Sequence, residues 1–382
     1  MTLEVMVKPG LEGVVAAQTH LSSVDGEAGE LIIAGFPVEE LASKATFEET
    51  VYLLWHDALP DGRQLAVFRE ALTARRSLPS ITLETLQAAA AQKIPAMDAL
   101  RMAASTLSLS APGESPSDDH RRDALALVAS FPTIVATYWR LLNGKRPIAP
   151  RPDLSHAANY LHMLFGDVPG PERVRGMETY LNTVTDHGLN ASTFTARVII
   201  STQSDLVSAI VGAVGALKGP LHGGAPGPAL DMVFEIGEAG RAESVLRQKL
   251  ARGERLMGFG HRIYRVRDPR ADVLAAAAER MYRTEGDMKL YQLVRHVEQM
   301  ALRLLEEYKP GRRLQTNVEF YTALLLHGLN LPTDLFTPTF AVGRVAGWIA
   351  HCFEQQAQNR LIRPQSEYIG ARDRRWLPVE RR

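Results

Sequence analysis

The sequence lacks several patterns that would place it in a specialised class of protein. It contains a single cysteine, Cys352, in 382 residues. One thiol excludes an intrachain disulfide framework and any multi-cysteine zinc or iron–sulfur site, and it is typical of a reducing compartment. Positive charge is not in excess either, because 43 Lys and Arg residues match 43 Asp and Glu residues. This balance argues against a surface built to bind nucleic acid or another polyanion.

Targeting segments and long apolar runs are also missing. The N-terminus has no basic region followed by an apolar one, so we expect no secretory signal. The longest apolar stretch, residues 124–139, is interrupted by Ser130, Pro132 and Thr133 and is shorter than the ~20 residues that a bilayer requires. We expect this stretch to form a buried helix in a cytoplasmic protein with no membrane partner.

Helical periodicity dominates what is present. Thr46 and Glu49 form a capping-box pattern before an apolar helical face, and a second apolar face runs over residues 294–305. The best strand candidate is Glu30–Ala34, which follows the turn-like pair Asp25 and Gly26. We therefore predict an all-α fold with one small N-terminal β-hairpin.

Common catalytic loops are absent. The chain has no G-x-x-x-x-G-K-[ST] loop, no G-x-G-x-x-G after a strand and no G-x-S-x-G elbow. Three histidines stand out instead, since His187, His222 and His261 all lie among small or turn-forming residues. Neighbouring glycines let a substrate approach an imidazole closely, although each histidine could equally cap a helix or face solvent. A three-histidine zinc site is an alternative that the spacings of 35 and 39 residues disfavour.

Arginines supply a second candidate group. Arg262, Arg265, Arg267 and Arg270 follow His261, and Arg344 lies in an apolar helical run. An arginine among apolar neighbours favours an anionic small molecule, because its planar guanidinium binds carboxylate bidentately. The alternatives are a solvated charge run for the first group and an ion pair between helices for Arg344.

Glu319 is a lone carboxylate at the start of the apolar run 320–326. A carboxylate against apolar surface has a raised pKa and can act as a base. A first-turn acid that interacts favourably with the helix dipole is the alternative interpretation.

Six segments, in this order, strongly resemble citrate synthases of the short bacterial type that includes 2-methylcitrate synthases. They are DHGLNASTFTARV, LKGPLHGGA, MGFGHRIYRVRDPRADVL, NVEFYTALLL, FAVGRVAGWIAHCFEQ and RLIRPQSEYIG. The resemblance spans residues 10–370. It implies a helical homodimer whose subunits have two domains. The large domain would comprise residues 1–221 and 326–382. The small domain would comprise residues 222–325, and it would close over the substrates and exclude water.

The resemblance also implies a role for each matching residue. His222 would stabilise the enol of acetyl-CoA, His261 would polarise the ketone of oxaloacetate, and Glu319 would be the base. The oxaloacetate carboxylates and pocket would be contacted by His187, Arg270, Arg344, Phe340 and, from the partner subunit, Arg363. CoA would be contacted by Met257, Gly258, Phe259, Gly260 and Arg265. The reaction implied calls for no metal or redox cofactor.

Two departures from the family pattern qualify these roles. Glu319 replaces the usual aspartate and adds about 1.5 Å of reach, and Pro226 stands where asparagine is frequent. The leading hypothesis is a citrate synthase. Its alternatives are a 2-methylcitrate synthase that uses propionyl-CoA, an enzyme with both activities, and a non-catalytic protein that senses CoA esters or oxaloacetate.

Overall fold

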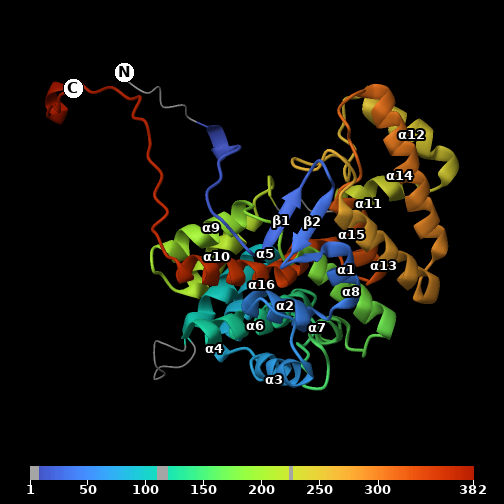
Figure 1. Cartoon of the computed structure of the whole chain (residues 1–382), viewed down its shortest axis with the longest axis horizontal. Coiled ribbons are helices and arrows are strands. Elements are labelled where there is room, and N and C mark those ends of the chain that lie inside the picture. Colours follow the sequence, from blue (N-terminus) through green and yellow to red (C-terminus); the bar gives the residue numbers. More distant parts are fainter. Residues whose placement is uncertain (1–7, 110–118, 223–226) are drawn as a thin grey trace.

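The computed structural model describes residues 8–109, 119–222 and 227–382 (Figure 1). Over these ranges the chain forms sixteen α-helices and one three-stranded sheet, which confirms the predicted class. The helices of the first half are α1 (Val38–Lys44), α2 (Phe47–His56), α3 (Gly62–Thr73), α4 (Ser80–Ala91), α5 (Ala96–Ser105), α6 (Asp119–Leu142), α7 (His156–Phe165) and α8 (Pro171–Val184). Those of the second half are α9 (Ala191–Ser201), α10 (Leu206–Leu217), α11 (Gly227–Ile236), α12 (Ala242–Ala251), α13 (Pro269–Glu285), α14 (Met288–Tyr308), α15 (Val318–Gly328) and α16 (Phe336–Ala357).

Local signals explain where several helices begin. The predicted capping box is present, since the Thr46 hydroxyl accepts the Glu49 N–H while the Glu49 carboxylate accepts the Thr46 N–H. Asp268 caps α13 with Pro269 at its first position, and Asn317 caps α15. These two caps matter later, because α13 and α15 begin at residues of the candidate site.

Helix α6 lies at the centre of the larger group of helices and packs against α4, α5, α7 and α16. The predicted buried helix over residues 124–139 is confirmed, with Pro132 inside it. Residues 121–142 are long and apolar enough to cross a membrane by composition, yet 67% of that window is buried inside the fold. Burial of this kind is what a core helix shows.

Helix α16 is buried along most of its length and packs against α8 and α9. Gly343 and Gly347 face α8, where a Cβ on Gly343 would lie 2.9 Å from the carbonyl oxygen of Leu181 and one on Gly347 would overlap that of Thr185. Two glycines one turn apart therefore let α16 approach the end of α8 at backbone distance.

The sheet consists of β1 (Ser22–Asp25), β2 (Glu30–Ile33) and β3 (Phe36–Pro37), all antiparallel, so a short third strand extends the predicted hairpin. Leu31 and Ile33 point to one side of β2 and are fully buried. They form a small core with residues of α1, α2, α13 and α16, separate from the main core. The hairpin is thus anchored on helices at its base, while its tip lies against the orange part of the chain (Figure 1).

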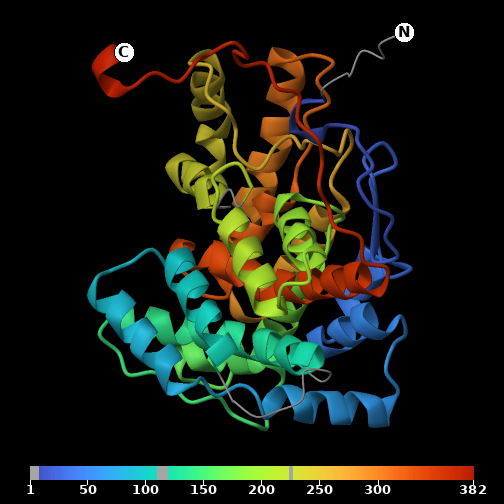
Figure 2. The same ribbon diagram turned by 90° about the vertical axis from the view of Figure 1, so that its left-hand side faces the viewer.

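Helices α11, α12, α14 and α15 form a second group that stands beside the first in both ribbon views (Figure 2). Helix α13 belongs to both, since it packs against α15 and α14 and also against α8 and α1. The predicted domain boundary at residue 325 falls within α15, and residues Phe320 to Leu326 of that helix are buried in the continuous main core. The division into two closing domains stays a prediction.

Candidate functional site

The structure brings His187 and His261 together. Their ring centroids lie 5.9 Å apart, and the Tyr264 hydroxyl lies 3.2 Å from His187 Nε2. The backbone N–H groups of Ile263 and Tyr264 donate to His261 Nδ1 at 3.1 and 3.2 Å. Since Nδ1 accepts, the proton of the neutral ring sits on Nε2. His261 therefore has one N–H left with which to bind a substrate oxygen.

His222 lies on the turn that follows α10 and is held by the start of α9. Its Nε2 lies 2.7 Å from the Ser192 hydroxyl and accepts the Ser192 backbone N–H at 3.3 Å. Trp348 in α16 donates its indole N–H to the same hydroxyl at 3.0 Å. When Nε2 accepts the Ser192 N–H, the neutral ring carries its proton on Nδ1, which is then the nitrogen that can donate.

All three histidines are held in the neutral form. Burial, with a smaller contribution from Arg270, lowers the pKa of His261 to about 4, and burial together with Arg344 lowers the pKa of His222 to about 4. Burial and both arginines take the pKa of His187 well below its usual range. At neutral pH these rings act as uncharged hydrogen-bonding groups.

Arg270 is buried at the start of α13 and is already paired. Its guanidinium contacts Asp268 bidentately, with Nε to Oδ1 at 3.0 Å and Nη2 to Oδ2 at 2.8 Å, and both side chains are almost inaccessible. Burial works against the charge, but Asp268 keeps the pKa of Arg270 above its ordinary value. The DPR sequence thus builds the helix cap and orients the arginine with the same aspartate.

Arg344 is equally buried but has a different environment. Its Nε donates to the carbonyl oxygen of Val184 at the end of α8, and its guanidinium lies 4.7 Å from the ring centre of Phe340, one turn earlier in α16. In the described part of the chain it forms no ion pair, so the interhelical pair considered from the sequence is not what holds it. Burial lowers the pKa of Arg344 to about 10, although Asp186 nearby raises it.

Glu319 occupies the first turn of α15 and is half-buried. Burial raises the pKa of its carboxyl to about 7, against the opposing effect of Arg270 and, more weakly, Arg255. The two interpretations from the sequence therefore coincide: the residue is a first-turn acid and also a carboxylate whose pKa is suited to proton transfer at neutral pH.

The Met257–Gly260 loop is built against the same residues that begin α15. Phe259 pairs with Thr316, Asn317 N–H donates to the Gly258 oxygen at 2.9 Å, and Gly260 N–H donates to the Gln315 oxygen at 2.7 Å. Gly258 and Gly260 adopt φ of +88° and +82°, and a Cβ on Gly258 would lie 2.8 Å from the Phe320 ring. The loop is consequently hydrogen-bonded to the residues that begin the helix carrying Glu319.

The remaining candidates from the sequence have different environments. Arg265 is exposed, Arg363 is exposed in the segment after α16, and Pro226 lies outside the described residues. Arg262 is exposed as expected for a solvated charge, whereas Arg267 is paired with Asp272 and Glu298 at 2.6 Å. Where the structure describes the chain, no three His, Cys, Asp or Glu side chains form a metal-binding group, so the zinc alternative gains no support.

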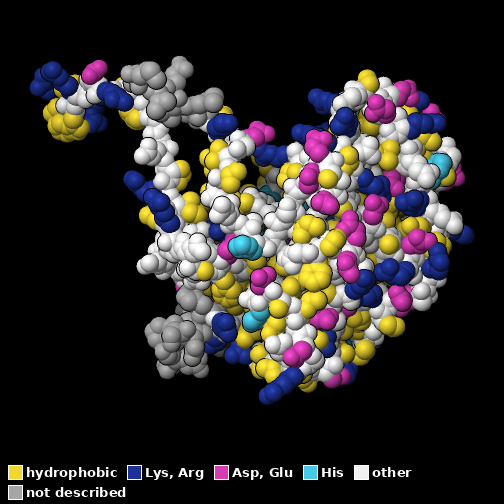
Figure 3. Space-filling view, in the orientation of Figure 1, with side chains coloured by type: hydrophobic (Ala, Val, Ile, Leu, Met, Phe, Trp, Pro, Cys, Tyr) yellow, Lys and Arg dark blue, Asp and Glu magenta, His cyan; other side chains and the backbone are white. Residues whose placement is uncertain are grey.

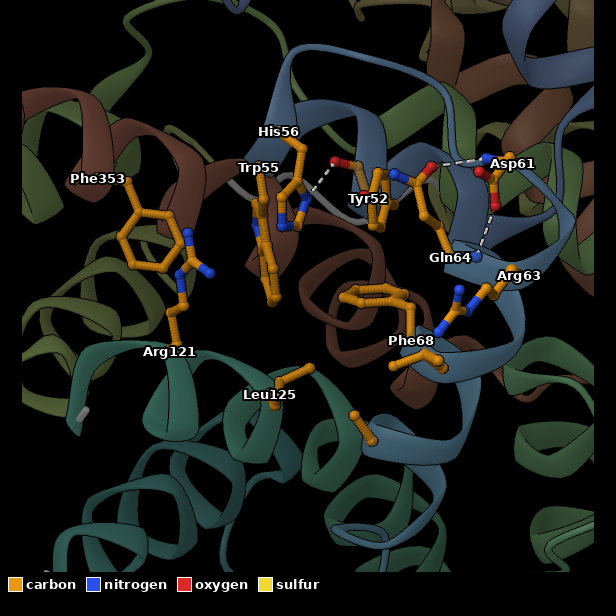
Figure 4. Close-up of a pocket in the computed structure, with 12 residues that line it drawn as sticks. Tyr52, Trp55, His56, Asp61, Arg63, Gln64, Phe68, Arg121, Leu125 and Phe353 are labelled. Carbon is orange, nitrogen blue, oxygen red and sulfur yellow. Dashed lines mark hydrogen bonds between the residues drawn. The ribbon is translucent and has the colours of Figure 1, made fainter.

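A large pocket of about 970 Å³ does not coincide with the candidate site. It is lined by α2, α3, the start of α6 and Phe353, with the rings of Trp55 and Phe68 in edge contact at 5.8 Å (Figure 4). None of the predicted site residues lines it.

Sequence reasoning missed several residues that shape the site. Tyr264, Asp268 and Ser192 each contact a predicted site residue directly, and Trp348 contacts Ser192. The aspartate before Pro269 could have been recognised as a helix cap. Nothing local marks the other contacts, because Ser192 and His222 are 30 residues apart and Ser192 and Trp348 are 156 apart.

Comparison with known proteins connects this geometry to a family. A family model described as the C-terminal domain of citrate synthase matches residues 10–365. The chain belongs to the citrate synthase family. Members of the family are acyltransferases, so the chain is an enzyme of that class.

Relatives within the family cover nearly the whole chain. A citrate synthase of Haloferax volcanii is 41% identical over 98% of this chain and 99% of its own. A 2-methylcitrate synthase of Mycobacterium tuberculosis is 40% identical over 97% of this chain and 92% of its own. Identity at this level does not separate the two names.

Solved structures of citrate synthases share the fold. The enzyme of Pyrobaculum aerophilum superimposes with a TM-score of 0.89 at 37% identity, covering 98% of this chain and 95% of its own. The enzyme of Thermoplasma acidophilum, solved as a ternary complex with carboxymethyl coenzyme A and oxaloacetate, has a TM-score of 0.87 at 29% identity, covering 99% of this chain and all of its own.

Proposed function

We propose that the chain condenses acetyl-CoA with oxaloacetate and hydrolyses the product thioester to citrate and CoA. The proposal rests on one arrangement: the Glu319 carboxylate, with a pKa of about 7, lies within the electrostatic influence of Arg270, which also acts on the neutral rings of His187 and His261. A base of matched pKa, uncharged donors and fixed cations are what enolisation next to a dianion requires.

In this proposal Glu319 removes a proton from the acetyl methyl group while His222 donates a hydrogen bond to the thioester oxygen. The resulting carbon nucleophile forms a bond to the ketone carbon of oxaloacetate, and His261 donates from Nε2 to the ketone oxygen, which gains a proton and becomes a hydroxyl. Water then cleaves the thioester and releases the CoA thiol. His187, Arg270 and Arg344 bind the two carboxylates, and Phe340 covers one side of Arg344.

CoA is assigned to the loop Met257, Gly258, Phe259 and Gly260, with Arg265 near its phosphates. The exposure of Arg265 supports this placement, because an exposed guanidinium suits an anionic group such as a phosphate. The positive φ angles of the two glycines give the loop a backbone course that other residues rarely adopt. We also propose that residues 222–325 close over the bound substrates and that no metal or redox cofactor takes part.

The test of the reaction is thiol release by purified protein supplied with oxaloacetate and either acetyl-CoA or propionyl-CoA. We expect acetyl-CoA to give the higher kcat/KM. A higher value with propionyl-CoA would make the enzyme a 2-methylcitrate synthase, a name that relatives of 40% identity carry. If neither ester released thiol and calorimetry still showed that oxaloacetate binds, the protein would be a non-catalytic sensor.

Substitution of the base tests its assignment. Glu319→Gln keeps the shape of the side chain but cannot accept a proton, so turnover should nearly vanish while oxaloacetate still binds. Glu319→Asp is the matched variant, because it keeps the carboxylate and moves it by about one bond length, a displacement that can change rates on the order of a hundredfold. Retention of most activity in Glu319→Gln would disprove the assignment.

We further propose a cytoplasmic homodimer in which Arg363 completes the partner's site. The segment after α16 leaves the body of the subunit (Figure 3) and carries exposed apolar side chains, among them Tyr368, Ile369 and Trp376. An extended arm of this kind gains burial only against another molecule. The single cysteine, Cys352, which is free and buried, agrees with a reducing compartment.

Mixing two inactive variants tests the shared site. In a dimer of one Glu319→Gln chain and one Arg363→Ala chain, one of the two sites would have both native residues. Random exchange would form such dimers in half of the population, so about a quarter of native activity should return. No recovery after verified subunit exchange would show that Arg363 serves its own subunit.

A further inference from the structure

We propose that the β1–β2 hairpin is a positioning element of the active site, which fixes the segment carrying His261 relative to the segment carrying His187. The inference rests on the proposed function, because it assigns the hairpin a role in placing these two oxaloacetate-binding histidines. The hairpin contacts both segments, one near its base and one at its tip.

The base of the hairpin is hydrogen-bonded to both neighbours of His187. The Ser22 hydroxyl in β1 donates to Asp186 Oδ2 and accepts the Gly188 N–H at 2.8 Å. Asp186 is fully buried and also accepts from His351 in α16 at 3.1 Å. The base therefore connects the His187 segment to the sheet and to α16 by contacts that water cannot easily replace.

The turn at the tip has its own internal hydrogen bonds. Asp25 Oδ1 accepts the N–H groups of Glu27 at 2.9 Å and Ala28 at 2.8 Å, and the Gly29 N–H donates to the Asp25 oxygen at 3.0 Å. The side chain of Asp25 is used in the way that aspartate commonly stabilises turns. The tip thus has a defined shape that does not depend on the segment it touches.

The tip meets the His261 segment at backbone distance. Gly26 O accepts the Arg265 N–H at 2.8 Å, and a Cβ built on Gly26 would overlap the carbonyl oxygen of Ile263. A Cβ on Gly29 would lie 2.7 Å from Val266 Cγ2. Two positions of the turn therefore need glycine, because no side chain fits between the turn and residues 263–266.

Displacement of this contact would move catalytic groups. The N–H groups of Ile263 and Tyr264 hold His261 through Nδ1, and the Tyr264 hydroxyl reaches His187. A shift of the Ile263 backbone would alter both the direction of the His261 donor and the spacing of the two rings. Misplacement by ~1 Å can cost on the order of a hundredfold in rate.

Gly26→Ala is the direct test. The φ of Gly26 lies outside the left-handed region, so alanine causes no backbone strain of its own, and the added methyl group acts only through Ile263. We expect kcat/KM for oxaloacetate to fall about 10- to 100-fold, mainly through KM. KM for the CoA ester should rise less than KM for oxaloacetate, because the Met257–Gly260 loop is held by residues 315–317 and only Arg265 of the proposed CoA contacts lies in the displaced segment.

Two matched controls accompany it. Gly62→Ala, at the start of α3, adds a methyl group with nothing within 4 Å, and Glu27→Ala removes only an exposed contact of 3.7 Å with Arg313 at the same tip. Both should retain native kinetics. Asp25→Ala is a second variant in case Gly26→Ala folds poorly: it loosens the turn from an exposed position and should act in the same direction with a smaller effect.

Amide hydrogen exchange provides a readout that does not need activity. Exchange at residues 263–267 should become faster in Gly26→Ala and stay native in Gly62→Ala. If native protein released no thiol, the proposed function would fail, while exchange would still report on the hairpin contact. Native oxaloacetate kinetics together with native exchange in Gly26→Ala would overturn the inference, as would equal losses in Gly26→Ala and Gly62→Ala.

Discussion

Arg270 and Arg344 are two buried arginines with the same proposed substrate, yet only one of them has a partner of opposite charge. Arg270 is held bidentately by Asp268, whereas Arg344 donates to a backbone carbonyl and rests on Phe340. The pKa of Arg270 is accordingly raised and that of Arg344 is lowered to about 10. The charge of Arg270 is balanced by Asp268, which also orients its side chain. The charge of Arg344 has no such counter-charge, and a substrate carboxylate would provide one.

The largest expected effects come from replacing each arginine by methionine, a residue of similar length. Both Arg270→Met and Arg344→Met should weaken oxaloacetate binding at least about 100-fold, since each removes a charged hydrogen-bonding partner worth ~2–5 kcal/mol when desolvated. Their stabilities should differ. Arg270→Met leaves the buried Asp268 unpaired and should lower the free energy of unfolding by ~3–5 kcal/mol, whereas Arg344→Met removes an unpaired buried cation and should not lower it.

Calorimetric titration with oxaloacetate and urea unfolding would measure these two quantities. Arg267→Met is a control, because Arg267 lies in the same segment but pairs with Asp272 and Glu298 outside the proposed substrate set. Equal losses of stability in Arg270→Met and Arg344→Met would contradict the distinction between the two arginines.

A smaller effect is expected from Asp268→Asn, which separates the counter-charge of Arg270 from the helix cap. Asparagine caps helices about as well as aspartate, so α13 should keep its start. The ion pair becomes a hydrogen bond from the charged guanidinium to a neutral amide oxygen, and the free energy of unfolding should fall by ~1.5–3 kcal/mol. KM for oxaloacetate should rise less than about tenfold. A loss as large as that of Arg270→Met would mean that charge, more than orientation, is what Asp268 supplies.

The smallest effect concerns pH. Glu319 must be unprotonated to act, so kcat/KM should fall as pH drops below about 7. Arg270 and Arg255 hold this pKa down, and Arg344 is not among its causes. Arg255→Gln should therefore move the acid limb upward by a few tenths of a pH unit, while Arg344→Met should leave its position unchanged. An identical shift in both variants would show that the arginines act on Glu319 alike.

Stability changes in the same pH range have defined signs. The raised pKa of Glu319 makes the folded state bind more protons than the unfolded state between about pH 4.5 and 7, so its contribution favours folding as pH falls. The lowered pKa values of His222 and His261 act oppositely, and their contribution is lost as pH falls from about 6.5 to about 4. Rate profiles between about pH 6 and 8 avoid most of the second loss.

Much of the helical framework could be predicted from the sequence because its signals are local. The capping box at Thr46 and the apolar face over residues 294–305 both correspond to helices, and the hairpin was expected at Glu30. Strand β3 was missed, since two residues with a proline carry no period-2 pattern.

The residues of the candidate site could be identified from family motifs. The contacts between them could not be predicted from the sequence. Glu319 has ambiguous surroundings in the sequence, and only burial within the fold raises its pKa. The contact between Gly26 and Arg265 spans most of the chain, so neither residue marks the other. Tertiary proximity, which decides partners and pKa values, is not encoded in any short window.

The glycines of α16 limit how this chain can change by mutation. Arg344 reaches the carbonyl of Val184 only because Gly343 and Gly347 allow the helix to lie directly on the end of α8. Any larger side chain at either position would push the arginine away from the other site residues, even though neither glycine has a group that can take part in a reaction. Replacement of either glycine is therefore expected to weaken substrate binding as much as replacement of the arginine itself.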